Sequence, residues 1–252
     1  MIQKTLISVN NEIFQKFPNT KVAVALIEGV VVTSKKGPNY KVLSPYKQEV
    51  AKMTNERGIT ESNVSTRAVC ESWDKVFKST GVEDDKKSTI YNLLKRAAVE
   101  GEKIQNKQKA NMGNINDIVD MYNCVSIEAE TPMGALSKEK IKGDIVLRFG
   151  KEGETFKGLG MEEAIKVKEG NVVYADNESI LTLHWNYRDA HHACVPNKTE
   201  NPIQVYVFAD QAHVGAGDPA KAIDLLCDKV VKIGWKVLGK GTIDEKNPTL
   251  SL

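Results

Sequence analysis

The clearest pattern of apolar and polar positions lies between residues 180 and 188. Two sets of four residues alternate there, with Leu181, Leu183, Trp185 and Tyr187 in one set and Thr182, His184, Asn186 and Arg188 in the other. A period of two places successive side chains on opposite faces of a sheet. The pattern therefore predicts a strand with one apolar and one polar face, which runs on through residues 189–195 to a turn at Pro196.

Other segments show helical or strand periodicity of their own. Apolar residues at helical spacing predict a short helix before Pro18 and longer helices over residues 46–57, 62–80, 89–102, 114–125 and 218–233. Apolar runs predict strands over residues 21–33, 144–149, 155–156, 172–175, 203–209 and 235–238. We expect Gly29 to mark a bulge or bend, and Ser88 and Asp218 to cap helices. We expect residues 34–45 to form a loop and the tail after Gly241 to be loose.

Most helices precede most strands, which predicts an α+β fold. The 252 residues could form one large domain or two small ones, and we find no repeat and no clear linker. The 35 basic and 33 acidic residues give a net charge of +2, which permits a nucleic-acid partner without requiring one. Four cysteines without paired spacing predict a reduced, intracellular protein. The lack of a long apolar run predicts a cytoplasmic protein without a signal peptide or membrane partner.

A basic segment surrounds the predicted helix 89–102. Its candidate phosphate-contacting residues are Lys86, Lys87, Lys95, Arg96, Lys103 and Lys107. Such a surface would bind nucleic acid in a salt-sensitive way, because binding releases counterions. A solvated helix face is the commoner explanation of this pattern.

Three of the four histidines lie between residues 180 and 201, so this stretch is the first place to look for chemistry. His191 and Cys194 have a short, ligand-like spacing that His184 could complete, but no recognised metal signature is present, and we expect no metal. Cys194 could be a nucleophile beside a base, or a structural cysteine. Gly215-Ala216-Gly217 could hold a phosphate at a helix start, although a Gly-x-Gly without the Walker lysine is usually only a loop.

A polar cleft is the remaining possibility. Arg148 ends a predicted strand, Glu154 follows a turn, and His184, Asn186 and Arg188 share the polar strand face. These groups could position a water against an ester carbonyl and stabilise the resulting oxyanion. The same pattern is also that of an ordinary polar sheet surface, which the residues alone favour.

A series of short motifs resembles a known family. The motifs are Lys87-Ser88 ahead of Leu93-Leu94-Lys95-Arg96, Ile115-Asn116-Asp117-Ile118-Val119-Asp120 with Asn123, Thr131-Pro132-Met133-Gly134-Ala135, Gly143-Asp144-Ile145-Val146-Leu147-Arg148 with Gly153-Glu154, Val173-Tyr174-Ala175-Asp176, and Trp185-Asn186-Tyr187-Arg188-Asp189 with Val195 and Thr199-Glu200-Asn201. In this order they resemble freestanding relatives of the editing domain of the phenylalanyl-tRNA synthetase beta subunit. The resemblance covers about half of the chain.

The resemblance implies a mixed, sandwich-like β-sheet core with flanking helices. It also implies a single domain over residues 1–252, in which an N-terminal α/β extension (residues 1–72) packs on a family core (residues 73–240). In the synthetases this domain hydrolyses the ester of a wrongly charged tRNA, and freestanding members are thought to act in trans; some clear a tRNA that carries an arginine analogue. The implied chemistry is attack by a positioned water, without a covalent nucleophile or a cofactor.

The chain departs from the family pattern at several positions. The synthetase form has a Gly-Gly-Glu-x-Ser-Gly-Val segment where this chain has residues 189–195, so its glutamate is replaced by His191. Recognition of a tyrosine hydroxyl is therefore not carried over. Relatives often have a proline at the position of Lys87 and an aspartate at that of Ser137. The chain also has no room for the ligation module of the synthetase.

The resulting hypothesis is a trans-acting aminoacyl-tRNA deacylase. The expected catalytic residues are His184, His191 and Glu154, and the expected substrate-binding residues are Asn123, Arg148, Asn186, Arg188, Asp189 and His192. The basic set defined above would contact the acceptor backbone of the tRNA, and no DNA partner is expected. The alternatives are a module of the same fold that binds a tRNA or an amino acid without turnover, and a protein-interaction domain of a translation complex.

Overall fold

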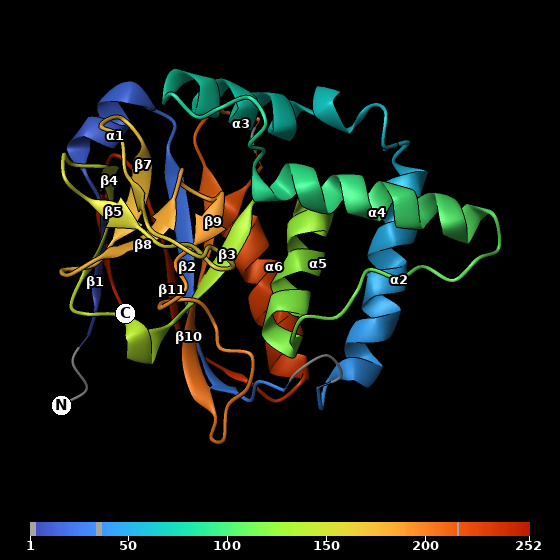
Figure 1. The fold of residues 1–252 in the computed structure, drawn as a ribbon. Helices are drawn as coiled ribbons and strands as arrows, with labels where there is room; N and C mark the ends of the chain where they lie inside the picture. Colours follow the sequence, from blue (N-terminus) through green and yellow to red (C-terminus); the bar gives the residue numbers. More distant parts are fainter. Residues whose placement is uncertain (1–3, 34–36, 216) are drawn as a thin grey trace.

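The computed structural model describes residues 4–33, 37–215 and 217–252, and it confirms the mixed α+β class. The two large β-sheets lie on the left of Figure 1 and most of the helices on the right. The six-stranded sheet has the order β12 (Thr249–Ser251), β1 (Leu6–Val9), β4 (Ile145–Phe149), β7 (Val172–Ala175), β8 (Ile180–Leu183) and β9 (Arg188–Asp189). The four-stranded sheet has the order β11 (Lys236–Ile243), β2 (Lys21–Val30), β10 (Ile203–Gln211) and β3 (Met133–Ser137). A small ribbon pairs β5 (Thr155–Phe156) with β6 (Ile165–Lys166).

Side chains from the two large sheets meet between them. The ring of Tyr174 on β7 packs against that of Phe208 on β10, with 5.1 Å between their centroids. The strand β10 is apolar on both faces because one face contacts this interior and the other faces the helices. The two sheets therefore form the sandwich-like core that the family resemblance implies.

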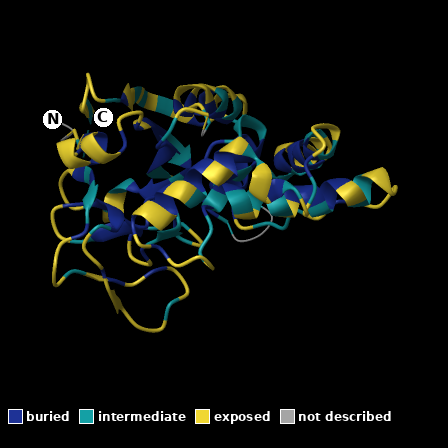
Figure 2. Cartoon of the chain, turned by 90° about the horizontal axis from the view of Figure 1, so that it is seen from above, coloured by how far each residue is buried: buried dark blue, intermediate teal, exposed yellow. Residues whose placement is uncertain are grey.

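Most of the helices build a layer outward from the four-stranded sheet, whereas the first one packs on β4 of the six-stranded sheet. The helices are α1 (Asn11–Lys16), α2 (Tyr40–Glu56), α3 (Ala68–Ser79), α4 (Thr89–Gln105), α5 (Asp117–Ala129) and α6 (Pro219–Lys232), with short 3₁₀ turns at Val64–Thr66 and Lys138–Lys140. Helix α6 packs on β2, β10 and β11, α5 packs on α6 and β3, and α2 contacts both α4 and α5. Buried residues lie on one side of these helices and exposed residues on the other, as their apolar spacing predicts (Figure 2).

Several local predictions are confirmed. Gly29 has a φ of 88° and is skipped in the register between β2 and β10, so it is the predicted bulge. The Ser88 hydroxyl accepts a hydrogen bond from the Tyr91 N–H, and the Asp218 carboxylate accepts one from the Lys221 N–H. These side chains are therefore the predicted N-caps of α4 and α6.

The predicted continuous strand over residues 180–188 is wrong. Strand β8 ends at Leu183, residues 184–187 turn back, and β9 pairs antiparallel with β8. His184 and Trp185 have φ values of 52° and 65°, in the left-handed region that side chains other than glycine rarely adopt. The Trp185 ring is packed between Phe17 and Trp73, and this tertiary packing holds the turn against the local preference.

Two segments predicted to be irregular are ordered, and the start of one helix is displaced. Helix α2 begins at Tyr40 and includes Pro45, so the predicted loop is wrong over residues 40–45, while residues 34–36 lie outside the described residues. The predicted loose tail contains β12, which pairs with β1, a strand the sequence did not reveal. Helix α5 starts at Asp117 instead of residue 114, because Asn116 is its N-cap.

The first 72 residues contribute to both sheets. Strand β1 pairs with β4 and β12, and β2 pairs with β10 and β11. We infer from this pairing that the chain forms one domain; the boundary at residue 73 between an extension and a core stays a prediction. No helix within the described ranges is both long and apolar enough to cross a bilayer.

Candidate functional site

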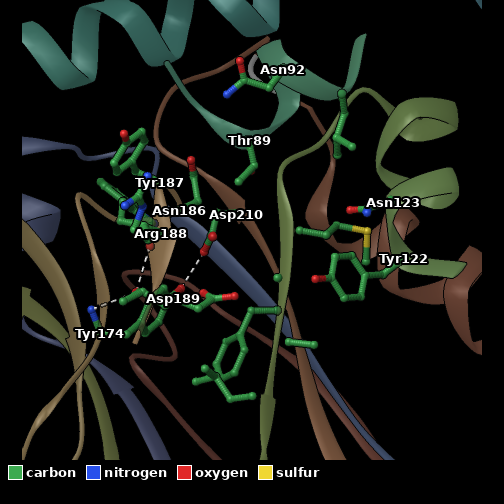
Figure 3. A pocket seen from close by; sticks show the side chains of 18 residues that line it. Thr89, Asn92, Tyr122, Asn123, Tyr174, Asn186, Tyr187, Arg188, Asp189 and Asp210 are labelled. Carbon is green, nitrogen blue, oxygen red and sulfur yellow. Dashed lines mark hydrogen bonds between the residues drawn. The ribbon is translucent and has the colours of Figure 1, made fainter. Parts of the chain in front are cut away.

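A cavity with two compartments opens between the sheets and helices α4 and α5. The inner compartment has a volume of about 210 Å³ and is lined by the first turn of α4, by α5, β3 and β10, and by the turn between β8 and β9 (Figure 3). The outer compartment has a volume of about 800 Å³ and is lined by the start of α5, the 3₁₀ turn after β3, and residues 191–197. Tyr122, Asn123, Ala135 and Asp189 line both compartments, so they mark the junction between them.

Asp189 is the acidic group at this junction. Its carboxylate makes no hydrogen bond and no ion pair with any described residue. Burial raises the pKa of Asp189 to about 7, because no cation offsets the lost hydration of the charged form. Gly134 lies beside this carboxylate, since a Cβ there would be in ordinary contact with Asp189 Oδ1, at 3.9 Å. Asp189 can therefore receive a cationic group, or exchange a proton near neutral pH.

A second carboxyl group lies in the inner compartment. Asp210 accepts a hydrogen bond from the hydroxyl of Tyr174, at 2.5 Å, and is 2% exposed (Figure 3). Burial raises the pKa of Asp210 to about 7, and the nearby charge of Asp189 raises it further, while the bond from Tyr174 lowers it. Asp210 therefore has a protein partner, whereas Asp189 does not.

Besides Asp189, three side chains of the inner compartment have buried polar atoms without a hydrogen-bond partner in the described parts of the chain. They are Thr89, through its Oγ1, Trp185, through its Nε1, and Asn186, through both Oδ1 and Nδ2. Asn186 is 9% exposed. Leaving such a group without a hydrogen bond costs about 1–3 kcal/mol. A bound molecule could recover this energy by supplying the missing partner.

Six of the predicted site residues lie together. Asn186 and Arg188 line the inner compartment, His191 and His192 line the outer one, and Asn123 and Asp189 line both. The guanidinium of Arg188 lies over the Tyr187 ring, 5.4 Å from its centroid. Gly158 makes room for that side chain, because a Cβ there would lie 2.5 Å from Arg188 Cδ.

The other three predicted residues line neither compartment. Arg148 and Glu154 form an ion pair with each other at 2.5 Å. The bond from Arg148 lowers the pKa of Glu154, so Glu154 is a carboxylate held by its partner. His184 is buried in the turn after β8, and burial lowers its pKa to about 4, an effect that the charge of Lys86 strengthens. His184 is therefore neutral at pH 7.

The cysteine and metal alternatives have little support in the geometry. Cys194 Sγ donates to the carbonyl oxygen of His191 at 3.3 Å, and burial raises the thiol pKa, so the thiolate is disfavoured at neutral pH. Within the described residues, no three His, Cys, Asp or Glu side chains are grouped in a way that could hold a metal ion. In the glycine motif, Ala216 lies outside the described residues. Gly217 packs against Thr131, where a Cβ would lie 2.4 Å from Oγ1.

Most of the predicted basic set is engaged with acidic side chains. The ion pairs are Lys86 with Glu83, Lys87 with Asp74 at 3.0 Å, Lys95 with Glu61 at 3.1 Å, and Lys103 with Glu100 at 2.6 Å. This arrangement agrees with the solvated helix face. Exposed pairs of this kind contribute little to stability, about 0–1 kcal/mol, so a phosphate could still displace the carboxylates.

Several residues of the cavity were not predicted as site residues. These are Thr89, Tyr122, Tyr174 and Asp210 around the inner compartment and junction, and Lys140 and Lys142 in the outer compartment. One signal was available, because Asp210 is an acidic residue at the end of an otherwise apolar run. Nothing in the local sequence distinguishes Thr89 or the two lysines from surface residues.

The comparisons agree with the resemblance seen in the sequence. Over 108 residues the chain is 32% identical to the phenylalanine–tRNA ligase beta subunit of Protochlamydia amoebophila, a match that covers 42% of this chain and 13% of the relative. Over 94 residues it is 30% identical to that subunit of Neisseria meningitidis serogroup B, covering 37% of this chain and 12% of the relative. The chain thus spans only a small part of these relatives.

Among solved structures, an N-terminal fragment of the phenylalanyl-tRNA synthetase beta subunit from Pyrococcus horikoshii is similar, with a TM-score of 0.44 and 10% identity, over 94% of this chain and 52% of that one. The family profile of the B3/4 domain matches residues 89–216, which is just over half of the chain and includes every residue at the junction of the two compartments. The chain therefore belongs to the B3/4 domain family.

Proposed function

We propose that this protein hydrolyses the ester bond of a mischarged aminoacyl-tRNA supplied in trans. The observation that carries the proposal is the unpaired carboxyl of Asp189 at the junction between a small inner compartment and a wider outer one. An aminoacyl-tRNA end has matching parts: a side chain, a cationic α-amino group beside the ester, and a terminal nucleoside.

In this arrangement the amino-acid side chain enters the inner compartment. The ionised Asp189 binds the α-ammonium group, and Asn123 hydrogen-bonds beside it. The terminal ribose and adenine lie in the outer compartment, where His191 or His192 orients the ribose or the attacking water. Catalysis then comes from positioning a water against the ester carbonyl. Lys140 and Lys142 contact the nearby phosphates, and the basic set extends this contact along the acceptor stem.

The predicted roles of His184 and Glu154 become indirect in this scheme. His184 shapes the turn that carries Asn186, and Glu154 holds Arg148. Their direct participation stays a prediction. His184→Ala and His191→Ala separate the two schemes, because only the loss of His191 removes a group from the cavity. Intact deacylation by both variants would contradict a catalytic role for either histidine.

A deacylation assay tests the proposed function. The protein is mixed with a panel of tRNAs charged with cognate and near-cognate amino acids, and ester loss is compared with a no-protein control. Selective loss of one mischarged species is the expected result. If the protein binds tRNA but hydrolyses no ester, it is a binding module. If it neither hydrolyses an ester nor binds tRNA, tRNA is not its partner.

A further inference from the structure

Two unpartnered polar side chains line the same compartment although they come from distant parts of the chain. Thr89 is the first residue of α4, and Asn186 lies in the turn between β8 and β9 (Figure 3). The Asn186 side chain is more than nine-tenths buried, and both of its polar atoms lack a described partner. The hydroxyl oxygen of Thr89 is buried and lacks one as well.

The neighbouring polar groups do not fill this need. Asp210 is bonded to Tyr174, and the guanidinium of Arg188 lies over the Tyr187 ring. The rest of the wall contains apolar residues such as Leu93, Met133 and Phe208. It also contains the polar residues Asn92, Asn123, Thr182 and Asp189, none of which forms a hydrogen bond with the side chain of Thr89 or Asn186. No described protein group therefore satisfies Thr89 and Asn186, and a ligand with a suitable polar group could do so.

We propose that Thr89 and Asn186 form a recognition subsite that selects aminoacyl groups whose side chains carry a hydroxyl or carboxamide over hydrocarbon side chains of the same shape. The inference rests on the proposed function, because it assigns a substrate class to that site. A carboxamide and a hydroxyl can each donate and accept, so this pair complements a neutral group that does the same.

The selection should be strongly asymmetric. A hydrocarbon side chain would leave the hydroxyl and the amide unpaired, and sites built to hydrogen-bond a substrate discriminate strongly against analogues that lack the polar group. A purely apolar pocket rejects a hydroxyl isostere only weakly. A strong preference for the polar member of a shape-matched pair would therefore come from hydrogen bonds to Thr89 and Asn186, and not from the shape of the compartment.

Binding of non-hydrolysable adenosine analogues tests the subsite directly. The probes carry a 3′-amide in place of the ester and form two shape-matched pairs, threonyl with valyl and asparaginyl with leucyl. We expect the wild-type protein to bind the polar member of at least one pair ~10-fold or more tightly. Thr89→Val and Asn186→Leu should bring that ratio close to one, whereas Thr89→Ser, which keeps the hydroxyl, should preserve it. Thermal unfolding of each variant checks that it is folded.

A parallel deacylation assay with the corresponding tRNA esters separates the two proposals. A polar preference without ester hydrolysis would support the subsite and contradict the proposed function. Ester hydrolysis without a polar preference would support the proposed function and contradict the subsite. Equal binding of both members of both pairs by the wild-type protein would overturn the subsite without reference to any variant, and so would no measurable binding of any probe.

Discussion

At the scale of single residues, the cavity contains two acidic groups, the buried Asp210 and the partly exposed Asp189. Asp189 and Asp210 both have a pKa near 7, raised from the ordinary value of 3.8 chiefly by burial. Only Asp210 has a hydrogen-bonded partner. A carboxyl group kept in this state destabilises the fold when ionised, and this cost is typical of residues retained for function.

Titration of these two carboxyls should therefore lower the stability of the protein between pH 4 and pH 7, whereas His184, whose pKa burial lowers to about 4, contributes a rise in stability over part of this range. Over this range the unfolded chain releases protons from these two carboxyls while the folded chain retains them, so rising pH favours unfolding, and the effect levels off above pH 7. Asp189→Asn removes one of the two groups and should reduce the pH-dependent loss of unfolding free energy by about 1–3 kcal/mol. The expected reduction is modest because Asp189 is partly exposed. Thermal or urea unfolding at pH 5 and pH 8 measures this. Equal pH dependence in the variant and the wild type would contradict the raised pKa.

The same residue should matter for activity. Asp189→Asn keeps the shape of the side chain but removes the charge that binds the α-ammonium group, so kcat/KM for deacylation should fall by about 10–100-fold. Glu154→Gln is the matched control, because Glu154 lies outside both compartments. If kcat/KM falls further for Glu154→Gln than for Asp189→Asn, the catalytic role that the sequence analysis predicts for Glu154 would be supported instead.

At the scale of elements, the turn between β8 and β9 places three residues of the cavity wall. Trp185 is 1% exposed, and its ring centroid is 5.5 Å from that of Phe17 and 5.2 Å from that of Trp73. This packing holds Trp185 and His184 in the left-handed region, where each costs about 1–2 kcal/mol. The turn is thus anchored by the core, while the residues after it face the cavity.

Removal of that anchor should disturb both stability and the site. Trp185→Ala should lower the free energy of unfolding by about 3–5 kcal/mol, through lost burial and the cavity left behind. It should also weaken binding of the aminoacyl-adenosine amides, because Asn186 and Asp189 lose their support. Urea unfolding and a binding titration measure the two effects. Trp235→Ala, a change at another buried tryptophan, controls for general destabilisation.

Helix α2 contains a proline, Pro45, and tertiary packing keeps the segment helical in spite of it. Pro45 is exposed and lies five residues after the start of the helix, so it removes the hydrogen bond that its N–H would give to Lys41. The next two residues anchor the helix: Tyr46 donates to Glu128 at 2.6 Å, and Lys47 pairs with Asp120 at 2.5 Å.

Replacement of this proline should stabilise the protein. Pro45→Ala restores the backbone donor in a helix that is already formed, so the free energy of unfolding should rise by about 1–3 kcal/mol. Chemical denaturation of the two proteins provides the comparison. A decrease instead would mean that residues 40–45 are not helical in solution.

At the scale of the whole molecule, the net charge of +2 gives little long-range attraction for tRNA, so any such binding depends on local groups. Arg96 and Lys107 are the members of the basic set that form no ion pair with a described residue. Lys140 and Lys142 lie in the outer compartment itself. These four residues are therefore candidates for contacts with phosphates.

The salt dependence of tRNA binding can identify the contacting residues. If both members of a pair contact phosphates, the double variant Lys140→Ala/Lys142→Ala should lower the slope of log K against log salt by about 1–2, since each neutralised phosphate contributes about 0.9. Arg96→Ala/Lys107→Ala tests the helix surface in the same way. Lys232→Ala, an exposed lysine on α6, should leave the slope unchanged. An unchanged slope in both double variants would contradict the proposed tRNA surface.

The sequence by itself determined the elements whose signals are local. Long apolar runs gave β2 and β10, helical spacing gave α3, α4 and α6, and capping side chains marked helix starts at Ser88 and Asp218, because these depend on neighbours a few residues away. The motif order also placed the chain in its family. The sequence could group Asn186, Arg188, Asp189, His191 and His192 because they are close along the chain.

Only the tertiary structure decided which groups share the cavity. Thr89, Asn123 and Asp210 come from three different elements, and their meeting with Asp189 depends on how α4, α5 and β10 pack. The turn at His184 is held by aromatic contacts with distant segments. An alternating pattern of apolar and polar residues carries no information about such contacts. Arg148 and Glu154 lie outside the cavity for the same reason. Long-range packing fixes the direction of their side chains, and the local sequence pattern does not.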